Sequence, residues 1–488
     1  MNNIFDKLKN YSDSDYYAFH MPGHKRNLDL MDGTSPYRID ITEIDGFDDL
    51  HHAEGILRDA QERAARVYHA DETHFLVNGS TVGILSAILG TTEKGDSILV
   101  ARNCHKSVYH AIYLNELDPV YLYPKFDTEQ GLSTEIDAAD VQKALEEHPK
   151  IRAVMIVSPT YDGVVSDIEK IAEIVHAKGC PLIVDEAHGA HFGFDPYFPK
   201  SANIYGADLV INSLHKTLPA LTQTALLHVN GDMVKRRKVK QYLDMLQTSS
   251  PSYILMASID ACIGMLEETL ETHSDARSDY KYKNIFSEYA NRIEALRKDL
   301  KRLKYLKIIQ TDNTDRYDRS KFVISVKHAP MSSHELYEIL LHRYHLQMEM
   351  LAGTYVLAMT TVGDTQEGLD RLRDALLEID KEIDTRQGRP AAIETDLPLS
   401  GTQPALEKVW TIAEAVNRRD KIQKRSFEDS IGCISVEYAY LYPPGSPLIV
   451  PGERITKEAV EILHWYQEHD FSIEGLQSED GIEVWIDG

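Results

Sequence analysis

Short apolar runs alternate with helical stretches through the first half of this chain. The runs are typical of buried strands and lie at 97–101, 120–123, 153–157, 182–185 and 209–211. Stretches with apolar residues at helical spacing lie between several of them, at 138–147 and 168–178, and earlier at 56–68 and 82–89. Consecutive parallel strands need a long crossover, which is usually a helix. The alternation therefore predicts an α/β fold with a largely parallel sheet and helices on both faces.

A change of pattern after residue 255 predicts further domains. The chain has 488 residues, which is long for one core. A charged helical region at 254–303 is followed by a strand-like segment at 321–326 and more helices, which indicates a small α+β domain. A stretch rich in Gly and Pro at 385–405 is typical of a linker. We therefore expect an N-terminal segment and large domain at 1–255, a small domain at 256–385 and a C-terminal domain at 386–488.

Composition narrows the classes of partner. Lys and Arg total 52 against 77 Asp and Glu, which gives a formal net charge of -25. This balance disfavours nucleic acid and anionic membranes, because both attract clustered basic residues. No apolar run reaches 18 residues, the first residues lack the apolar core of a signal peptide, and the four cysteines are scattered. We expect a cytoplasmic protein with reduced thiols, and no metal-binding spacing is present.

Lys216 is the most informative single residue. It lies in Ser213-Leu214-His215-Lys216, directly after the apolar run 209–211. A lysine amine can bind a carbonyl cofactor covalently, while Ser213 and His215 hold a phosphate or a ring. A lysine at a strand end is more often a surface residue. That alternative is weakened by Asp185, which ends another apolar strand, because two such ends can open onto one cleft.

Three further strand ends support a pyridoxal phosphate site. Gly79-Ser80-Thr81 lies between a strand and a helix and can cradle an anion, although Ser or Thr there is usually only an N-cap. Asp185 can pair with a protonated ring nitrogen, and His105 can stack on a flat ring. The alternatives are a capping Asp and a surface His. This succession fits pyridoxal phosphate better than nicotinamide or ATP, because neither GxGxxG after a first strand nor GxxxxGK[ST] is present.

The motifs together resemble the Orn/Lys/Arg decarboxylase family of fold type I pyridoxal-phosphate enzymes. The resemblance covers nearly the whole chain. It rests on His20-Met21-Pro22-Gly23-His24-Lys25, Phe75 to Gly83, Arg102 to Ser107, Pro159-Thr160-Tyr161-Asp162-Gly163, Asp185-Glu186-Ala187-His188-Gly189, Ser213 to Gln223 and Tyr442 to Glu453. It implies a large domain similar to that of aspartate aminotransferase, with a smaller α+β domain and a C-terminal α+β domain.

The resemblance also implies a role for each site residue. Lys216 would bind the cofactor covalently, Asp185 would pair with its ring nitrogen and His105 would stack on it. Residues around the phosphate would be Ser80, Thr81, Ser213 and His215. Thr160 and His188 would lie near the cofactor, although the family position of His188 is Trp in some larger members.

The assembly implied by the resemblance is a homodimer with its active site at the subunit interface. Thr248 and Ser249 are similar to a segment that family dimers contribute to the partner's site. Larger members carry an N-terminal wing that helps to build rings, and this chain starts almost directly at the His20 to Lys25 motif. We therefore expect a dimer rather than a ring.

The implied reaction is α-decarboxylation of a basic amino acid to its amine and CO2. Arginine and lysine are favoured and ornithine comes third, giving agmatine, cadaverine or putrescine and a place in polyamine biosynthesis. A distal cation needs a carboxylate, for which Glu43, Asp45 and Glu437 are unranked candidates. Lys216 or His215 returns the proton to Cα. Two alternatives are another fold type I enzyme, such as an aminotransferase or carbon–sulfur lyase, and an inactive cofactor-binding homologue with a regulatory role.

Overall fold

The computed structural model describes residues 13–25, 27, 29, 36–271, 281–309, 316–385, 404–418, 420–442 and 446–486. The predicted linker therefore lies almost entirely outside the described residues, as do residues 443–445 of the Tyr442 motif. Within the described part, every helix is too short or too polar to cross a lipid bilayer.

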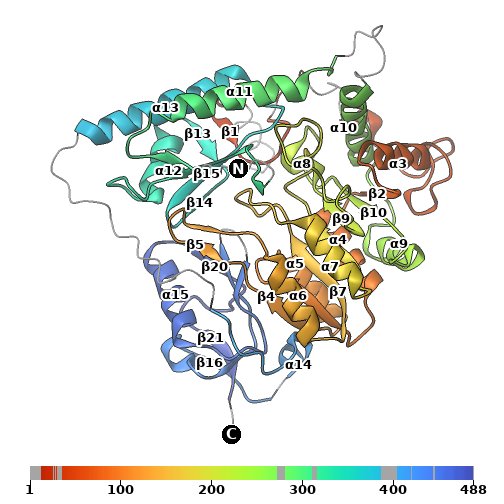
Figure 1. The fold of residues 1–488 in the computed structure, drawn as a ribbon, viewed down its shortest axis with the longest axis vertical. Helices are drawn as coiled ribbons and strands as arrows, with labels where there is room; N and C mark the ends of the chain where they lie inside the picture. Colours follow the sequence, from red (N-terminus) through yellow and green to blue (C-terminus); the bar gives the residue numbers. More distant parts are fainter. Residues whose placement is uncertain are drawn as a thin grey trace.

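A seven-stranded sheet forms the centre of the large domain, with the order β2-β10-β9-β8-β7-β3-β4 (Figure 1). Neighbours from β9 to β4 are parallel, whereas β10 pairs antiparallel with both β9 and β2. The strands are β2 (Glu72–Leu76), β3 (Ser97–Ala101), β4 (Asp118–Leu122), β7 (Ile151–Val157), β8 (Leu182–Asp185), β9 (Leu209–Asn212) and β10 (Ala225–Val229). The predicted α/β class is confirmed.

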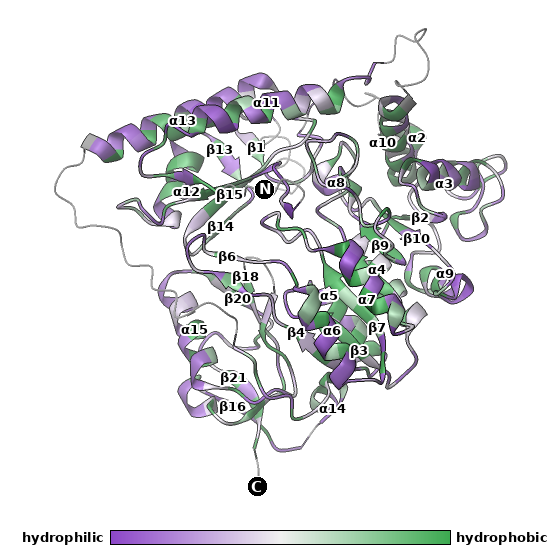
Figure 2. Ribbon diagram, in the orientation of Figure 1, coloured by the Kyte–Doolittle hydropathy of each residue, from purple (hydrophilic) through white to green (hydrophobic). Residues whose placement is uncertain are grey.

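Helices cover both faces of this sheet. Leu226 of β10 belongs to a core shared with α3 and α10, whereas its neighbours Ala225 and Leu227 belong to a core shared with α4 and α9. All four residues of β8 are buried, as expected for a strand covered on both faces. In Figure 2 the region of the sheet around β9 and α4 contains much of the green, hydrophobic colouring. The helices are α3 (Ile56–Val67), α4 (Gly79–Thr91), α5 (Lys106–Leu114), α6 (Ala138–Glu147), α7 (Ile168–Ala177), α8 (Leu214–Thr217), α9 (Arg236–Leu246) and α10 (Tyr253–Glu271).

The small domain packs helices on a four-stranded antiparallel sheet of order β11-β12-β15-β14. The expected continuous helical region at 254–303 consists of two helices, α10 and α11, on either side of residues that the structure does not describe. Near the N-terminus β1 (Tyr17–Phe19) pairs in parallel with β13 (Leu346–Met348), so the start of the chain joins the small domain. The other elements are β11 (Lys307–Ile308), β12 (Lys321–Ser325), β14 (Met350–Ala352), β15 (Tyr355–Met359), α11 (Ile285–Leu300), α12 (Ser333–His342) and α13 (Gln366–Thr385).

The C-terminal region has its own small core and two three-stranded sheets, β16-β21-β17 and β19-β18-β20. Its elements are α14 (Ile412–Val416), β16 (Ile422–Arg425), η4 (Glu428–Ser430), β17 (Ile434–Ser435), β18 (Ala439–Tyr442), β19 (Ser446–Ile449), α15 (Lys457–Glu468), β20 (Ser472–Glu474) and β21 (Ile482–Trp485). Short elements elsewhere are α2 (Pro36–Ile39), η2 (Leu50–His52), β5 (Phe126–Asp127) and β6 (Leu132–Ser133).

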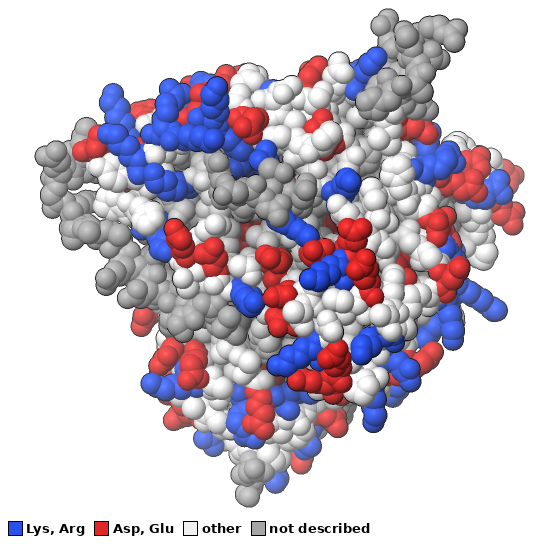
Figure 3. Space-filling model, viewed as in Figure 1, with Lys and Arg blue, Asp and Glu red and all other residues white. Residues whose placement is uncertain are grey.

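Charge on the viewed face is mixed. Figure 3 shows Lys and Arg gathered over α11 and α13 with Asp and Glu among them, and both signs are interspersed over the lower part of the molecule. The net charge of -25 is thus carried by a surface that is acidic on balance and contains both signs.

The sheet direction brings the predicted residues to one edge. β2, β3, β7, β8 and β9 all run the same way, because β10 is antiparallel to both of its neighbours. Their carboxyl ends therefore meet at one edge, which is where open α/β sheets bind ligands. Asp185 ends β8, and the other predicted cofactor-binding residues follow the ends of β2, β3, β7, β8 and β9.

Candidate active site

A cavity of about 230 Å³ opens at the carboxyl edge of the sheet, where the three regions of the chain meet. The large domain contributes Lys216, Asp185 and other predicted residues, the small domain contributes 352–355, and the C-terminal region contributes Ser446 and Tyr466. Of the predicted site residues, those that line the cavity are Ser80, His105, Thr160, Asp185, His188 and Lys216.

Lys216 and Asp185 both line the cavity. Burial lowers the pKa of the Lys216 amine, against the attraction of Asp185 and Glu349. Burial raises the pKa of Asp185, while the Lys216 charge and the Ala187 N–H oppose that shift. Asp185 is 3% exposed and accepts a hydrogen bond of 3.1 Å from the Ala187 N–H. A buried carboxylate with so little protein hydrogen bonding favours a ligand that brings a proton to it.

His188 contacts Lys216 directly. Its Nε2 lies 3.0 Å from the Lys216 Nζ, and its Nδ1 lies 3.3 Å from the Nζ of Lys321. The Tyr161 ring covers it at 4.4 Å between ring centres. Burial and the surrounding cations lower the pKa of His188 well below its ordinary value, so the ring is neutral.

His105 lies at the cavity wall with its ring open to the cavity. The Ser107 N–H donates to its Nδ1 over 3.3 Å, and the Ser107 Oγ lies 2.8 Å from the same nitrogen. These contacts fix the ring as the cap of α5. Partial desolvation at the cavity wall and the Lys216 charge lower the pKa of this exposed residue to about 4, so the ring is neutral near pH 7. A neutral, fixed imidazole is suited to stacking on a heteroaromatic ring.

The loop from β2 leads into α4 at Gly79 and Ser80, and the start of a helix is a place where an anion can bind. Gly79 has a φ of 72°, a conformation that favours glycine, and its N–H donates to the Gln223 carbonyl. Ser80 follows in the first turn and faces the cavity, whereas Thr81 is exposed. Ser213 is fully buried, and its Oγ has no hydrogen-bond partner among the described residues. A buried hydroxyl of this kind is an open position for a ligand oxygen.

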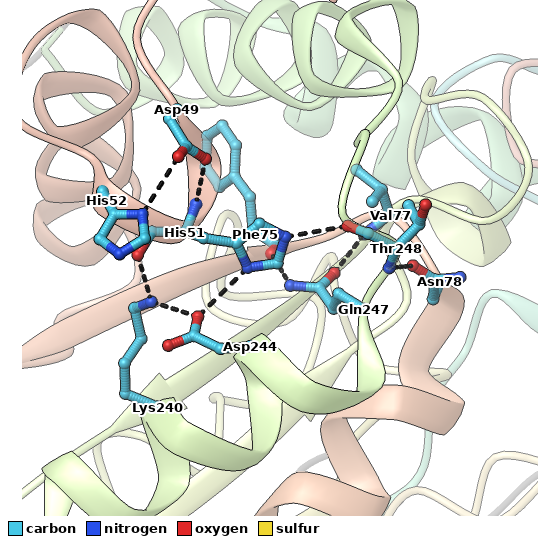
Figure 4. A network of polar contacts seen from close by, with 10 residues as sticks. All are labelled: Asp49, His51, His52, Phe75, Val77, Asn78, Lys240, Asp244, Gln247 and Thr248. Carbon is cyan, nitrogen blue, oxygen red and sulfur yellow. Dashed lines mark hydrogen bonds and ion pairs between the residues drawn. The ribbon is translucent and has the colours of Figure 1, made fainter. Parts of the chain in front are cut away.

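A polar network from the residues that follow α9 supports this loop (Figure 4). The Val77 N–H donates to the Gln247 Oε1 over 2.9 Å, and the Gln247 Nε2 donates to the Phe75 carbonyl over 3.3 Å. The Thr248 N–H donates to the Asn78 Oδ1 over 3.2 Å. The end of α9 therefore fixes the backbone immediately before Gly79.

His51 joins the N-terminal segment to α9 and to the residues that follow it. Its Nε2 lies 2.9 Å from the Thr248 carbonyl and its Nδ1 lies 3.2 Å from Asp244, while Lys240 donates to the His51 carbonyl over 2.7 Å (Figure 4). His51 and His52 are thus loop residues with structural partners. Thr248 and Ser249 are exposed and do not line the cavity of this chain.

Backbone contacts hold His215 and Thr160. The His215 Nδ1 donates to the Thr224 carbonyl over 2.9 Å, and burial lowers the pKa of this half-buried ring. Thr160 accepts a bond of 3.0 Å from the Val164 N–H and lines the cavity. The Gly23 N–H of the His20 to Lys25 motif donates to the His215 carbonyl over 2.7 Å. That motif therefore supports α8, which carries Lys216.

Several residues at the site were not predicted. Asp162 lines the cavity, is 7% exposed and accepts a bond from the Tyr355 hydroxyl. Burial raises its pKa to about 6, against Tyr355 and the charge of Lys321. Glu349 binds the Tyr161 hydroxyl and the Met21 N–H. The Thr160-Tyr161-Asp162 motif was a signal for Asp162, whereas the sequence carries no such signal for Lys321 or Glu349.

The three acidic candidates for reading the substrate lie elsewhere. Glu43 and Asp45 are exposed, and neither they nor Glu437 lines the cavity. Glu437 accepts the N–H groups of Gln477 and Glu483 over 2.9 and 2.7 Å, so its carboxylate is engaged within the C-terminal region.

The residues present fit pyridoxal phosphate. The cavity offers an amine at Lys216, a buried carboxylate at Asp185, a neutral ring at His105 and a hydroxyl at Ser80. These donors match a carbonyl, a ring nitrogen, a flat ring and a phosphate respectively. The unpartnered Ser213 hydroxyl and the sparsely bonded Asp185 are the structural observations that a bound cofactor explains.

Comparison with known proteins gives one consistent picture. A family model described as the Orn/Lys/Arg decarboxylase major domain matches residues 2–339, and the model of the C-terminal domain of the same family matches 401–484. The uncharacterized protein YaaO of Bacillus subtilis (strain 168) is 36% identical over 94% of this chain and 93% of its own length. The arginine decarboxylase of the same organism is 31% identical over 94% of this chain and 92% of its own.

A solved structure extends the comparison to the fold. The lysine decarboxylase LdcF of Francisella novicida superimposes with a TM-score of 0.78 at 18% identity, covering 98% of this chain and 80% of that one. At this identity the similarity shows a shared fold alone.

Proposed function

The chain belongs to the Orn/Lys/Arg decarboxylase family, and from that premise we propose that arginine is the amino acid it decarboxylates, giving agmatine and CO2. Its membership makes it a pyridoxal-phosphate-dependent decarboxylase of basic amino acids. The choice of arginine is supported by the 31% identity to an arginine decarboxylase over 94% of this chain.

The observation that carries this proposal is a carboxylate at the cavity wall. Asp162 lies beside Tyr355 in the cavity that Lys216 lines. A guanidinium is planar and pairs best with a carboxylate that accepts two parallel hydrogen bonds. We therefore assign Asp162 the role of reading the distal charge, in place of the exposed Glu43 and Asp45.

The remaining residues are assigned by the part of the cofactor that each would contact. Lys216 would bind the cofactor covalently, Asp185 would accept a hydrogen bond from its protonated ring nitrogen, and His105 would stack on the ring. Residues placed around the phosphate are Ser80, Thr81, Ser213 and His215. Thr160 and His188 would lie near the ring substituents. When bound, pyridoxal phosphate supplies a carbonyl for attachment and a protonated ring that takes up the electrons released as CO2 leaves.

The proton needed at the substrate Cα comes from the chain itself. Lys216 and His215 are the candidates, and both have pKa values lowered by burial.

The proposal predicts that Lys216→Ala abolishes both turnover and the visible absorption of the bound cofactor. The measurement is the absorption spectrum of purified protein together with CO2 and amine release from arginine, lysine and ornithine. A variant that keeps the visible band near wild-type intensity would contradict the role of Lys216. Release of a keto acid in place of CO2 would favour an aminotransferase.

We also propose a homodimer whose site is completed by the partner. Thr248 and Ser249 are exposed, and exposed apolar side chains lie in the two segments that His51 joins, at Phe47 and Met245. Such exposed apolar groups favour burial against another chain. Mixing Lys216→Ala with a Thr248→Ala/Ser249→Ala variant tests this, because hybrid dimers would regain one complete site. A sedimentation mass of one chain, or no regained activity, would overturn it.

A cytoplasmic place in polyamine synthesis follows from the same proposal. The four cysteines are free thiols, which suits a reducing compartment. Measurement of agmatine in cells with and without this chain tests the role.

A further inference from the structure

His188 lies between two lysine amines that come from different domains. Lys216 is on α8 of the large domain, and Lys321 is the first residue of β12 in the small domain. Their Nζ atoms lie 3.0 and 3.3 Å from the two ring nitrogens of His188. Lys321 is fully buried and His188 is 5% exposed. The three side chains therefore form one continuous line of nitrogen atoms.

The chemistry of these groups limits how the protons can be arranged. A neutral imidazole has one N–H and one lone pair, an ammonium only donates, and a neutral amine can accept. If both contacts are hydrogen bonds, one lysine must donate to His188 and the other must accept from it. The line then holds at most one ammonium, at the lysine that donates, and the tautomer of His188 shows which lysine that is.

We propose that Lys321 takes up the proton of Lys216 through His188, so that Lys216 becomes a neutral amine in the cavity. The Nζ–H of Lys216 passes its proton to Nε2 of His188, and Nδ1 of His188 passes its own proton to Nζ of Lys321. One N–H bond breaks and one forms at each step, and the total charge is unchanged. Lys321 is thereby a positioning residue, and the inference rests on the proposed role of Lys216.

The surroundings favour such an exchange. A lysine must lose its proton before it can attack a carbonyl, and a neighbouring neutral amine can accept that proton. Burial lowers the pKa of Lys321 to about 8, against the attraction of Asp318 and Glu349, so this amine changes its protonation near neutral pH. The charged and titratable groups facing the line are Asp162, Asp185, Asp318, Glu349, Lys25, His105 and His215.

The test measures how fast the cofactor-free full-length protein takes up pyridoxal phosphate at different pH values, followed by its visible absorption. The rate follows the fraction of neutral Lys216. Lys321→Met removes the proton acceptor, and we expect the midpoint of the pH profile to rise by about one unit. The matched control is Lys25→Met, which removes another buried lysine nearby. Lys25 donates to the His20 and Met359 carbonyls over 2.8 Å each and makes no hydrogen bond with His188 among the described residues, so its removal takes away only a neighbouring charge and should shift the midpoint less than Lys321→Met does.

A second variant separates proton transfer from simple charge repulsion. Lys321→Arg keeps the positive charge but cannot accept a proton. The guanidinium of this variant would always donate to Nδ1 of His188, so the His188 proton would stay on Nε2 and face Lys216. Lys216 would then have to accept that hydrogen bond as a neutral amine, and the midpoint of the pH profile would move downward. If Lys321 acts only through its charge, Lys321→Arg behaves as the wild type and the proposal is overturned. Equal shifts in Lys321→Met and Lys25→Met would also overturn it.

A measurement on the unsubstituted protein covers the case in which these variants do not fold. In protein labelled with ¹⁵N-histidine, the His188 signals, assigned with His188→Gln, should stay neutral and change tautomer as pH rises. A single tautomer at every pH would overturn the relay. The result is separable from the proposed function, because Lys216→Ala tests the attachment of the cofactor whatever Lys321 does.

Discussion

At the scale of single residues, burial sets the chemistry of this site. Lys216, Asp185 and His188 all have pKa values shifted by removal from water, each toward its neutral form. Oppositely charged neighbours limit the shift at Lys216 and Asp185, whereas cations deepen it at His188. Groups whose pKa values are shifted both by burial and by a specific charged neighbour are typical of a catalytic site.

Asp185→Asn is expected to lower turnover strongly while the fold stays intact. The carboxylate is expected to keep the ring nitrogen protonated, and an opposite charge at close range is worth one to three pKa units, which gives a loss of about 10- to 1000-fold. The measurement is kcat for arginine, with thermal unfolding as the control for folding. Near-normal kinetics with cofactor bound would contradict this role of Asp185.

The raised pKa of Asp162 leads to a prediction of how KM for arginine depends on pH. Its pKa is raised to about 6, so the carboxylate is protonated below that value and ionised above it. A guanidinium pairs with the ionised form. KM for arginine should therefore fall as pH rises through about 6 and level off above it.

Asp162→Asn should remove this pH dependence and raise KM by about 10- to 100-fold, the range expected for one charged hydrogen bond. Glu437→Gln is the matched control, because Glu437 bonds only backbone N–H groups of its own region among the described residues. If Glu437→Gln raises KM and Asp162→Asn does not, the assignment is wrong.

At the scale of elements, strands that are buried on both faces were predictable from the sequence. β3 and β8 have the expected bounds, because an uninterrupted apolar run has few other structures available. Their ends located Asp185 and His105 in advance. The strand order was not predictable, since β10 inserts antiparallel between β2 and β9.

Contacts between distant segments also escaped prediction. β1 pairs with β13, and Lys321 of β12 reaches His188, although more than a hundred residues separate each pair. Local periodicity contains no information on such pairing. The role of the His20 to Lys25 motif became visible only through the approach of Gly23 to α8, where a Cβ would lie 2.7 Å from the Leu218 backbone.

The loop that precedes α4 gives a prediction at this scale. Gln247→Ala would leave the buried Val77 N–H without its partner, which costs about 1–3 kcal/mol and loosens the backbone before Gly79 (Figure 4). We expect weaker cofactor binding and a lower unfolding temperature. The control is Gln142→Ala on α6, where the exposed side chain bonds only Glu146 among the described residues. Equal cofactor affinity in the two variants would argue against the support role of Gln247.

At the scale of the whole molecule, the site exists because three regions converge on one cavity. Lys216 comes from the large domain, Tyr355 from the small domain and Tyr466 from the C-terminal region. A buried ion pair joins the large domain to the C-terminal region. The Arg102 Nη2 lies 2.8 Å from Glu453 and donates to the Leu448 carbonyl over 3.1 Å. The side chains of both partners are almost wholly inaccessible to water, at 0% and 1% exposure.

This ion pair predicts how firmly the C-terminal region is held against the cavity. Glu453→Gln leaves the Arg102 charge buried without its counterion, which costs about 3–5 kcal/mol. The neighbouring pair Arg454 and Glu407 is exposed, so Arg454→Gln should cost less than about 1 kcal/mol. Because Arg102 lies three residues before His105, the Glu453 variant should lose cofactor affinity as well as thermal stability. Thermal unfolding and cofactor titration of both variants measure this, and comparable losses in the two would show that the buried pair does not hold the C-terminal region in place.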